Sequence, residues 1–374
     1  MLEGLRVLDL SRVLAGPLCT MLLGDLGADV IKVERPGTGD ESRTWGPPFD
    51  REGRSAYYLS VNRNKLGLAA DLDAPADRAV IERLLATADI VVDNFRPGTL
   101  ERRGISVDGW CARRPELVWC TITGFGLMVD RPGYDFVAQA EGGWMAITGE
   151  RDGEPMKVGV ALADVVAGKD AAVAILGAYV QRLRTGRGGR LSISLIDSAR
   201  AALVNVAQNA LVSGTDATRW GNAHPNLVPY QLFDAADHPI VVAVGSDAQW
   251  RASARALGLE ALAVDPALAT NEGRLANRER VVKEFSRQIA SEAAAVWRDR
   301  LDAAGVPNGI VYTVLETLAN TNGSAVTGMP SSVGGGVRFA PPAIDQHGDG
   351  IRQFGWDVFS RAKPWRHVDS VEVT

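Results

Sequence analysis

Strand-like and helix-like patterns alternate along the first half of the chain, and this alternation restricts the folds available to it. Residues 5–10 have the apolar pattern of a strand, residues 17–26 that of a helix with proline in its first turn, and residues 28–34 that of a second strand. Further strand patterns occur at residues 90–95 and 117–122. Strands that alternate with helices are typical of parallel sheets covered by helices on both faces. The predicted fold class is therefore α/β, with a Rossmann-like, doubly wound parallel sheet in a large domain.

The pattern changes near residue 221, where a second and smaller α/β domain is predicted. A strand pattern at residues 240–244 leads into alanine-rich helical stretches that continue towards residue 326. A glycine- and serine-rich stretch at residues 322–336 indicates a linker, and the tail after it is too short for a core of its own. We therefore expect a large domain formed by residues 1–220 and completed by residues 327–374, with a small domain at residues 221–326.

The composition limits the partners and the cellular setting. The 374-residue chain is 46% hydrophobic and 23% charged, which suits a globular protein with room for two domains. A net charge of −5 argues against nucleic acid as the main partner. Three cysteines without a CxxC pair and four histidines without metal-ligand spacing predict neither a disulfide framework nor a metal site. With no signal-peptide pattern and no membrane-spanning run, we expect a cytoplasmic protein that has no membrane partner.

The turn after the first strand lacks a dinucleotide-binding fingerprint. An NAD(P) dehydrogenase would carry GxGxxG there, whereas this chain has Ser-Arg-Val-Leu-Ala-Gly-Pro at residues 11–17. This class of oxidoreductase is therefore disfavoured.

Basic side chains occur instead in segments that are predicted to follow strands. Ligands of open α/β sheets bind at the carboxyl ends of the strands, and guanidinium groups hold phosphates through paired hydrogen bonds. Taken singly, each of these residues is better explained as ordinary surface charge, but their shared position favours a site for a polyphosphate such as that of coenzyme A. The residues are Arg35, Arg63, Lys65, Arg96, Arg102 and Arg103.

Asp164 opens an otherwise mostly apolar segment that continues to Val180. The apolar spacing predicts a largely buried helix with Asp164 near its start. One interpretation is structural, because aspartate at a helix start caps free backbone N–H groups. The other is catalytic, because a partly desolvated carboxylate can attack an activated carbonyl. The local pattern alone leaves both interpretations open.

Taken in order, these segments resemble the family III coenzyme A transferases, the CaiB/BaiF family. The similarity covers nearly the whole chain, with motifs at residues 14–17, 23–36, 62–65, 94–98, 133–136, 160–168, 185–188 and 220–230. The resemblance implies that Asp164 is the catalytic aspartate and that the protein is a homodimer of interlocked subunits. It also implies coenzyme A contacts at Arg35, Arg63, Lys65, Asn94, Arg96 and Arg102, and substrate-pocket positions at Ala15, Tyr134, Asp135, His224 and Tyr230.

Two departures from the family pattern affect the expected reaction. Acyl-CoA racemases of the same fold use a histidine where this chain has Tyr134, and a phenol is a poor base at neutral pH. The formyl-CoA branch has a glycine run where this chain has residues 224–230, which contain two prolines. The resemblance therefore favours transfer over racemisation, with a larger and dicarboxylic acyl group such as succinyl.

The expected function is transfer of coenzyme A from a donor acyl-CoA to an acceptor carboxylic acid, through an aspartyl anhydride and an aspartyl-CoA thioester. No tightly bound cofactor is expected, because acyl-CoA is itself a substrate. Two alternatives remain, a 2-methylacyl-CoA racemase or isomerase and a non-catalytic acyl-CoA binding protein. Tyr134 argues against the first alternative and Asp164 against the second.

Overall fold

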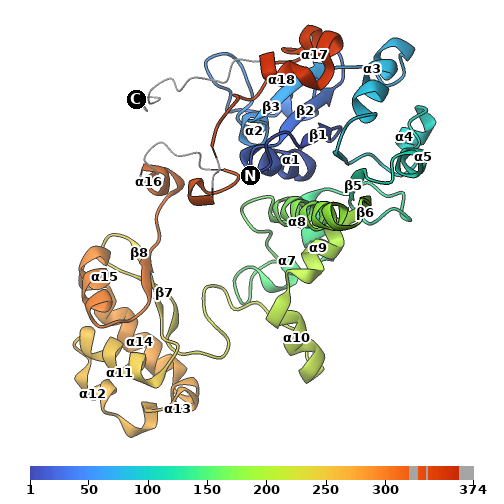
Figure 1. Cartoon of the computed structure of the whole chain (residues 1–374). Helices are drawn as coiled ribbons and strands as arrows, with labels where there is room; N and C mark the ends of the chain where they lie inside the picture. Colours follow the sequence, from blue (N-terminus) through green and yellow to red (C-terminus); the bar gives the residue numbers. More distant parts are fainter. Residues whose placement is uncertain (320–326, 334–335, 362–374) are drawn as a thin grey trace. The chain divides into compact units, whose positions relative to one another are not determined.

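The computed structural model describes residues 1–319, 327–333 and 336–361 (Figure 1). Contacts divide the chain into two compact units. The first comprises Met1–Met145, Lys157–Thr215 and the described part of Thr321–Thr374, and the second comprises Ala146–Met156 and the described part of Asp216–Asn320. Residues 146–156 therefore group with the second unit, whereas they were expected in the large domain. The expected boundary at residue 326, and with it much of the expected linker, lies outside the described residues.

A six-stranded sheet forms the centre of the first unit, and every neighbouring pair of its strands is parallel. The strand order β3-β2-β1-β4-β5-β6 confirms the predicted Rossmann-like parallel sheet. Between β1 and β4 the order changes direction, and in sheets of this kind ligands bind beside that point. The strands are β1 (Arg6–Asp9), β2 (Asp29–Glu34), β3 (Lys65–Ala69), β4 (Ile90–Asp93), β5 (Val118–Thr123) and β6 (Gly189–Ser194).

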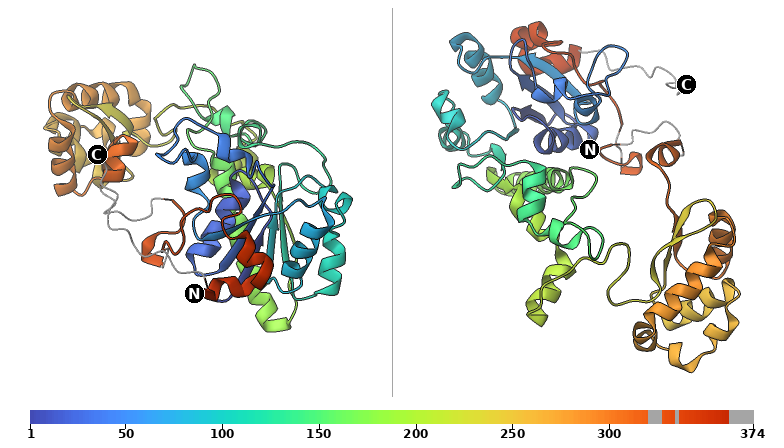
Figure 2. Two further views of the ribbon diagram at one scale, coloured as in Figure 1. Left: turned by 90° about the horizontal axis from the view of Figure 1, so that it is seen from above. Right: turned by 180° about the vertical axis from the view of Figure 1, so that it is seen from behind.

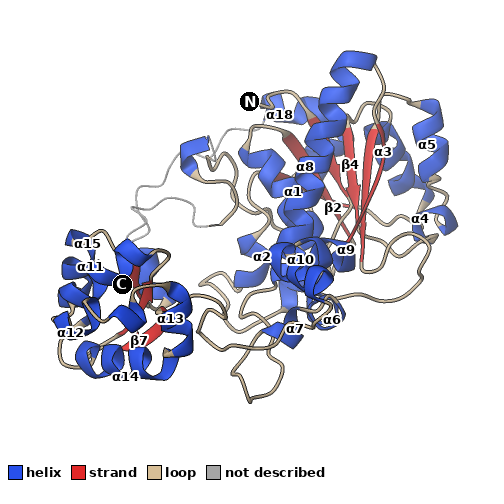
Figure 3. Ribbon diagram, turned by 90° about the horizontal axis from the view of Figure 1, so that it is seen from below, coloured by secondary structure: helices blue, strands red, loops and turns tan. Residues whose placement is uncertain are grey.

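Apolar side chains from the two faces of the sheet enter two separate cores. Val7 and Val30 belong to one core, whereas their chain neighbours Leu8 and Ile31 belong to the other. Successive strand residues point to opposite faces, so both faces must be covered by helices. The first core is covered by α1 (Ala15–Asp25), α6 (Asp135–Glu141), α8 (Leu162–Thr185) and α9 (Leu195–Ala201), and the second by α3 (Pro75–Leu85), α5 (Val107–Arg113) and α17 (Gly348–Phe354) (Figure 3).

Shorter helices complete the first unit. They are α2 (Ala56–Ser60), α4 (Thr99–Arg102), α10 (Val204–Ser213), α18 (Val358–Arg361) and the 3-10 helices Glu41–Thr44, Ser331–Val333 and Gly355–Asp357, while α7 (Trp144–Ile147) lies at the border between the units. Within the described ranges, none of the helices combines the length and the apolar character needed to cross a membrane.

Helices α1 and α8 approach closely because of a glycine. A Cβ atom at Gly168 would lie 2.7 Å from the carbonyl oxygen of Ala15 and 3.3 Å from the side chain of Leu18. Gly168 follows Asp164 by four residues, about one helical turn. The same close contact therefore sets the position of the Asp164 turn against the start of α1.

Residues 336–361 pack on the first unit beside β3, as the views in Figure 2 show. The side chain of Asn64 accepts hydrogen bonds from the backbone N–H groups of Arg338, at 2.6 Å, and Phe339, at 3.0 Å. Further along, the indole of Trp356 donates to the carbonyl oxygen of Leu84 at 3.1 Å. This segment thus contributes side chains to the second core.

The second unit has its own core between a small sheet and several helices. Its antiparallel strands are β7 (Tyr230–Asp234), β8 (Pro239–Ala243) and β9 (Asn308–Ile310). Trp250, Phe285 and Trp297 are fully buried at its centre. The helices are α11 (Asp247–Ala256), α12 (Glu260–Ala263), α13 (Asn271–Ala276), α14 (Arg278–Ile289), α15 (Ala294–Ala303) and α16 (Val314–Ala319), with a 3-10 turn at Pro266–Leu268.

Candidate active site

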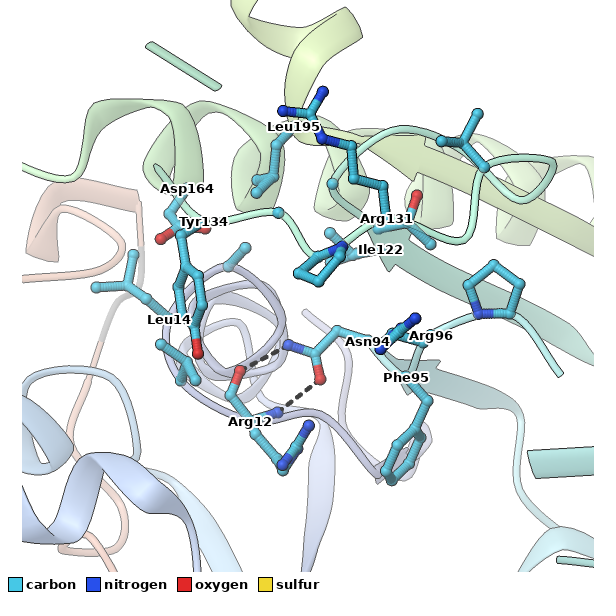
Figure 4. A pocket seen from close by; sticks show the side chains of 18 of the residues that line it. Arg12, Leu14, Asn94, Phe95, Arg96, Ile122, Arg131, Tyr134, Asp164 and Leu195 are labelled. Atoms are coloured by element: carbon cyan, nitrogen blue, oxygen red, sulfur yellow. Dashed lines mark hydrogen bonds between the residues drawn. The ribbon is translucent and has the colours of Figure 1, made fainter. Parts of the chain in front are cut away.

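The turns after β1 and β4 are joined at the point where the strand order reverses. Asn94 accepts a hydrogen bond from the backbone N–H of Arg12 at 2.9 Å and donates one to the carbonyl oxygen of Arg12 at 2.7 Å (Figure 4). The next residue, Val13, has a φ of 70°, a left-handed conformation that is strained for a β-branched residue. Its N–H donates to the Asp40 carboxylate at 3.2 Å. Asn94 and Asp40 thus hold a strained turn in one conformation.

The carboxylate of Asp40 is itself held by a buried ion pair. Lys32 donates to Asp40 at 3.0 Å and to the carbonyl oxygen of Ser11 at 2.9 Å, and both charged side chains are fully buried. Although burial raises the pKa of Asp40, the ammonium of Lys32 and hydrogen bonds from Ser42 bring it below its usual value. Asp40 is therefore a charged acceptor under the turn, which strengthens its hydrogen bond to the backbone of Val13.

A cavity of about 180 Å³ opens above this turn and contains Asp164 in its wall (Figure 4). Its other walls are the turn after β1, the segment after β4 and the segment after β5. These correspond to residues 12–15, 94–97, and 122–124 with 129 and 131–134, together with Glu41 and Leu195. Ala15 and Tyr134, which were expected in a substrate pocket, both line this cavity, and Tyr134 is 52% exposed.

Asp164 is a largely buried carboxylate in the first turn of α8, with an exposed fraction of 9%. Across the described residues, no hydrogen bond reaches its carboxylate oxygens. Burial, and secondarily the negative charge of Asp135, raises the pKa of Asp164 to about 7. A carboxylate whose charge is so poorly compensated is more basic and more nucleophilic than a solvated one.

Asp135, and not Asp164, caps helix α8. One oxygen of Asp135 accepts hydrogen bonds from the backbone N–H groups of Ala163, at 2.8 Å, and Asp164, at 3.4 Å. Its other oxygen accepts from Gln139 at 2.7 Å. The capping interpretation of Asp164 is therefore wrong, because its neighbour across the helix start already satisfies these backbone donors. The side chain of Asp164 remains available to the cavity.

Three guanidinium groups stand around the cavity, and each is paired with a carboxylate. Arg96 lies 2.8 Å from Asp130, and Arg12 lies 3.6 Å from Glu41. Arg131 makes two hydrogen bonds to Glu141. All six side chains are substantially exposed, so these ion pairs are weak and can exchange for a ligand anion at little cost.

A second cavity of about 500 Å³ lies beside the first, and the two share Arg12, Glu41 and Phe95. It is formed by the carboxyl ends of β2 and β3 and the residues after them, including Arg35 and residues 70–73. Arg103 completes its wall. The larger cavity, which Arg35 lines, therefore adjoins the smaller one, which Asp164 lines.

The expected coenzyme A contacts fall into three groups, namely residues that line a cavity, one exposed residue outside the cavities, and two buried residues. Arg35 lines the larger cavity, while Asn94 and Arg96 line the smaller one. Arg102 is exposed on α4, where it donates to the hydroxyl of Thr99 at 3.0 Å. Its neighbour Arg103, the C-cap residue of α4, lines the larger cavity instead.

Arg63 and Lys65 lie inside the protein, and the expectation that they follow a strand is wrong. Both precede or begin β3, so they are at the opposite end of that strand from the cavities. Arg63 pairs with Asp25 at 2.6 Å, and the fully buried ammonium of Lys65 lies 2.9 Å from Asp9. Burial lowers the pKa of Lys65 to about 8 despite the opposing charge of Asp9. Arg63 thus stabilises the end of α1 through its ion pair with Asp25, and Lys65 stabilises the end of β1 through its ion pair with Asp9.

His224 and Tyr230 belong to the second unit, where their rings stack at a centroid distance of 5.1 Å.

Tyr57 is a neighbour of the site that was not anticipated. Burial and the charges of Asp164 and Asp135 raise its pKa to about 12, so its phenol is neutral beside these carboxylates.

Arg12, Arg103 and Arg131 also line the cavities, and of these only Arg103 was anticipated as a basic residue after a strand. Arg12 could have been found from the sequence by its position directly after the first strand, at the carboxyl edge of the sheet.

Within the ranges that the structure describes, no group of three or more His, Cys, Asp or Glu side chains is arranged to hold a metal ion.

Sequence comparison identifies the family. Residues 2–336 match CoA-transferase family III. The chain is 39% identical over 368 residues to succinyl-CoA:glutarate CoA-transferase of Mus musculus, covering 92% of this chain and 84% of the relative. It is 42% identical to succinate–glutarate CoA-transferase of Agrobacterium fabrum, covering 85% and 82%, and 40% identical to succinyl-CoA:mesaconate CoA-transferase of Haloarcula hispanica, covering 82% and 80%.

Solved structures agree with this assignment. A CaiB/BaiF family protein from Brucella suis is 38% identical, with a TM-score of 0.85 over 94% of this chain and 98% of that one. Rv3272 from Mycobacterium tuberculosis is 28% identical, with a TM-score of 0.79 over 93% of this chain and 98% of that one. Because both the sequence match and the fold extend over most of its length, the chain belongs to CoA-transferase family III.

Proposed function

We propose that the protein transfers coenzyme A from a donor acyl-CoA to an acceptor carboxylic acid, with Asp164 as the nucleophile. The observation that carries this proposal is the state of the Asp164 carboxylate. It lines a cavity, receives no hydrogen bond from the described residues and has a pKa raised to about 7. Membership of the family and the names of its relatives support the same reaction class.

Coenzyme A is proposed to occupy the two adjoining cavities as a substrate, without a separate tightly bound cofactor. Its phosphates would bind near Arg35 and Arg103 in the larger cavity, where guanidinium groups can form charge-assisted hydrogen bonds. The pantetheine arm would pass the shared residues Arg12 and Phe95 and bring the thioester to Asp164. Arg63 and Lys65 are left out of this site because they are buried in internal ion pairs.

The proposed chemistry has four balanced steps. The Asp164 carboxylate attacks the thioester carbonyl of the donor, which gives an aspartyl anhydride and the coenzyme A thiolate. The thiolate attacks the Asp164 carbonyl of that anhydride, releasing the donor acid and leaving an aspartyl-CoA thioester. The acceptor carboxylate attacks this thioester and frees the thiolate again. The thiolate finally attacks the acceptor carbonyl, so that acyl-CoA leaves and Asp164 is regenerated.

A raised pKa assists this sequence in two ways. The ionised carboxylate is a stronger nucleophile because its charge is poorly compensated, and its conversion into a neutral anhydride or thioester removes a buried charge. Around neutral pH about half of the molecules carry the ionised form, if the pKa is about 7. The largely buried position of Asp164 also limits access of water to the anhydride.

A dicarboxylic acyl group such as succinyl is the proposed substrate class. The relatives are named for succinyl-CoA with glutarate or mesaconate, and these acids are dicarboxylic. Racemisation is the weaker candidate, because it needs a second acid or base, and both oxygens of Asp135 are occupied by donors at the start of α8 and in α6.

A homodimer is proposed from the apolar surface of the first unit. Helix α10 has no buried residue, and apolar side chains are exposed on α10 and on α8. Contiguous exposed apolar side chains are typical of contact surfaces. The exposed apolar side chains are Val173, Val180 and Leu183 on α8, and Val204, Leu211 and Val212 on α10. The cytoplasmic location and the interlocked arrangement stay predictions.

The decisive experiment replaces Asp164 with asparagine and measures transfer between a panel of acyl-CoA donors and carboxylic acids by mass spectrometry. Loss of at least about a thousandfold in kcat, with coenzyme A binding retained, is expected for a covalent nucleophile. In the parent protein with acyl-CoA, hydroxylamine should attack the activated Asp164 carbonyl of the anhydride or thioester, release the acid or the thiol, and leave an Asp164 hydroxamate that peptide mass spectrometry locates. Substantial turnover by Asp164→Asn, with deamidation excluded by mass, would reject the proposal.

A further inference from the structure

The segment after β5 forms a loop whose two ends touch at glycines. A Cβ atom on Gly133 would lie 2.5 Å from the Cα atom of Gly124, and one on Gly124 would lie 2.6 Å from the Cα atom of Gly133. Only residues without a side chain allow two backbones to come this close. Phe125 follows the first glycine and Arg131 comes two residues before the second, so the closed loop brings these side chains together. The guanidinium carbon of Arg131 lies 4.4 Å from the ring centroid of Phe125.

The guanidinium of Arg131 already binds a carboxylate. Two of its nitrogens donate to the two oxygens of Glu141, at 2.9 and 2.5 Å. Paired hydrogen bonds of this kind are the geometry in which arginine recognises a planar carboxylate. The ring of Phe125 supports the guanidinium through a cation–π contact. Glu141 therefore occupies a carboxylate site that is already formed.

The Glu141 carboxylate can be exchanged for another one. The side chains of Arg131 and Glu141 are 49% and 43% exposed, and an ion pair this exposed contributes little stability. If a ligand carboxylate took its place, Glu141 would be hydrated by the surrounding water. Arg131 would keep a bidentate anionic partner, so one ion pair would replace another.

Arg131 belongs to the cavity that contains Asp164 (Figure 4). Among the described residues, the wall includes Arg131, Tyr134 and Asp164 but not Glu141. Arg131 comes four residues before Asp135, which accepts a hydrogen bond from the backbone N–H of Asp164. Four residues span at most about 14 Å, so a short stretch of chain fixes Arg131 relative to the proposed nucleophile. A ligand in this cavity is bounded by both residues.

The other two arginines of the cavity wall are less suited to a carboxylate. Arg12 lies 3.6 Å from Glu41, beyond hydrogen-bond distance, and Glu41 also lines the cavity, where its charge would repel an anion. Arg96 directs two nitrogens at one oxygen of Asp130. Of the three, Arg131 is thus the one whose two nitrogens each bind a different carboxylate oxygen.

We propose that Arg131 binds the second carboxylate of a dicarboxylic acyl group, in exchange for Glu141, while the first carboxyl carbon reacts at Asp164. This inference rests on the proposed function, which supplies a dicarboxylic acid as a reactant. A monocarboxylic acyl group of the same length has no charge with which to displace Glu141. Arg131 is therefore the residue that determines the specificity for a dicarboxylic substrate.

The first test measures binding in the full-length protein with Asp164→Asn, which stops covalent reaction. Glutaryl-CoA and pentanoyl-CoA are titrated by calorimetry, because they have the same acyl length and differ by one terminal carboxylate. We expect glutaryl-CoA to bind about tenfold more tightly, as for one charge-assisted pair, and Arg131→Gln to abolish this preference. Equal affinities before Arg131 is changed, or a preference that survives Arg131→Gln, would overturn the proposal.

Glu141→Gln separates exchange from a purely structural ion pair. Removing the competing carboxylate should increase the preference for glutaryl-CoA by up to about fivefold, whereas loss of the preference would show that Glu141 is needed to hold Arg131. Arg96→Gln is the matched control, since Arg96 lines the same cavity and has an exposed acidic partner, and the preference should stay unchanged. Thermal melting verifies folding, and Glu141→Gln decides if Arg131→Gln does not fold.

Kinetics distinguish failure of this inference from failure of the proposed function. With Asp164 intact, glutarate and pentanoate are compared as acceptors in steady-state transfer. Arg131→Gln should lower kcat/KM for glutarate about tenfold and leave kcat/KM for pentanoate unchanged. A protein that transfers coenzyme A to no acid rejects the proposed function, and the binding preference then decides on Arg131. Transfer that remains equally selective in Arg131→Gln rejects the role of Arg131 alone.

Discussion

The Asp135 carboxylate accepts a hydrogen bond from the backbone N–H of Asp164 at 3.4 Å. This contact places a second negative charge next to Asp164 while using that charge to cap helix α8. Burial is the main cause of the raised pKa of Asp164, and Asp135 adds to it. One residue therefore has two effects, since Asp135 also stabilises the start of the helix.

The pH dependence of transfer should report this coupling. Replacing Asp135 with asparagine keeps an oxygen acceptor for the cap but removes the charge that raises the pKa of Asp164. The acid limb of the profile of kcat/KM against pH, expected near pH 7 in the parent, should move to lower pH. Pre-steady-state anhydride formation measured from pH 5 to 9 checks this shift. An unchanged limb would mean that another group titrates.

The stability of the fold should depend on the ionisation of Asp164. Its pKa is about 7 in the folded protein and 3.8 in its ordinary environment, so the charged form is disfavoured by folding. The free energy of unfolding should therefore fall as the pH rises from about 4 to 7. Asp164→Asn carries no charge at this position and so does not lose stability in this way. It should be more stable than the parent above pH 7 by a few kcal/mol. Near pH 4 the two proteins should have similar stability. Urea unfolding at pH 4.5 and 8 measures the difference, and equal effects at both values would contradict it.

Coenzyme A affinity should distinguish neighbouring arginines. Arg35→Ala and Arg103→Ala each remove a cation from the larger cavity and should weaken binding about tenfold or more, because a charge-assisted hydrogen bond to phosphate is lost. Arg102→Ala is the control, since Arg102 points to Thr99 on the exposed side of α4. Calorimetry with coenzyme A tests all three variants. A larger loss for Arg102→Ala than for Arg103→Ala would reverse the assignment.

The close contact of α1 and α8 should be sensitive to one methyl group. Gly168→Ala puts a Cβ 2.7 Å from the carbonyl oxygen of Ala15, so one helix must move. We expect a loss of about 1–3 kcal/mol in stability and reduced transfer, because the Asp164 turn moves with α8. Gly177 in the same helix has no atom within 4 Å of such a Cβ. Gly177→Ala should be neutral or stabilising by up to about 1 kcal/mol in thermal melts.

The strained turn at Val13 should depend on Asn94. Asn94→Ala removes both hydrogen bonds to the backbone of Arg12 and should cost about 1–3 kcal/mol in stability. Since the same turn lines both cavities, the KM for acyl-CoA should rise as well. Asn94→Asp keeps the acceptor for the Arg12 N–H and should be less affected in steady-state kinetics. Equal parent-like values for both variants would show that Asp40 holds the turn alone.

The sequence by itself determined the sheet, the family and the position of Asp164 at the start of a helix. Strand and helix periodicities are local properties, and buried parallel strands such as β1, β2 and β4 have apolar runs that can be read directly. The motifs around Asp164 and after the first strands are also local. Their order along the chain was enough to indicate a coenzyme A transferase.

The direction and partners of single side chains were decided only by the tertiary structure. Arg63 and Lys65 are basic residues near a strand, just as Arg35 is, but they precede β3 and meet Asp25 and Asp9 inside the protein. Arg102 and Arg103 are adjacent, yet only Arg103 lines the cavity.

The roles of Asp135 and Asp164 could not be separated from the sequence either. Either aspartate can cap a helix, and the choice depends on the contact between α6 and the start of α8. The two bonded residues, Asp135 and Asp164, are 29 positions apart in the sequence. Ion pairing and desolvation depend on such contacts between distant segments, whereas helix and strand formation depends on neighbours in the chain. This is why local patterns predicted the parallel sheet and the helix that begins near Asp164, but not which charges are buried, paired or free to bind a ligand.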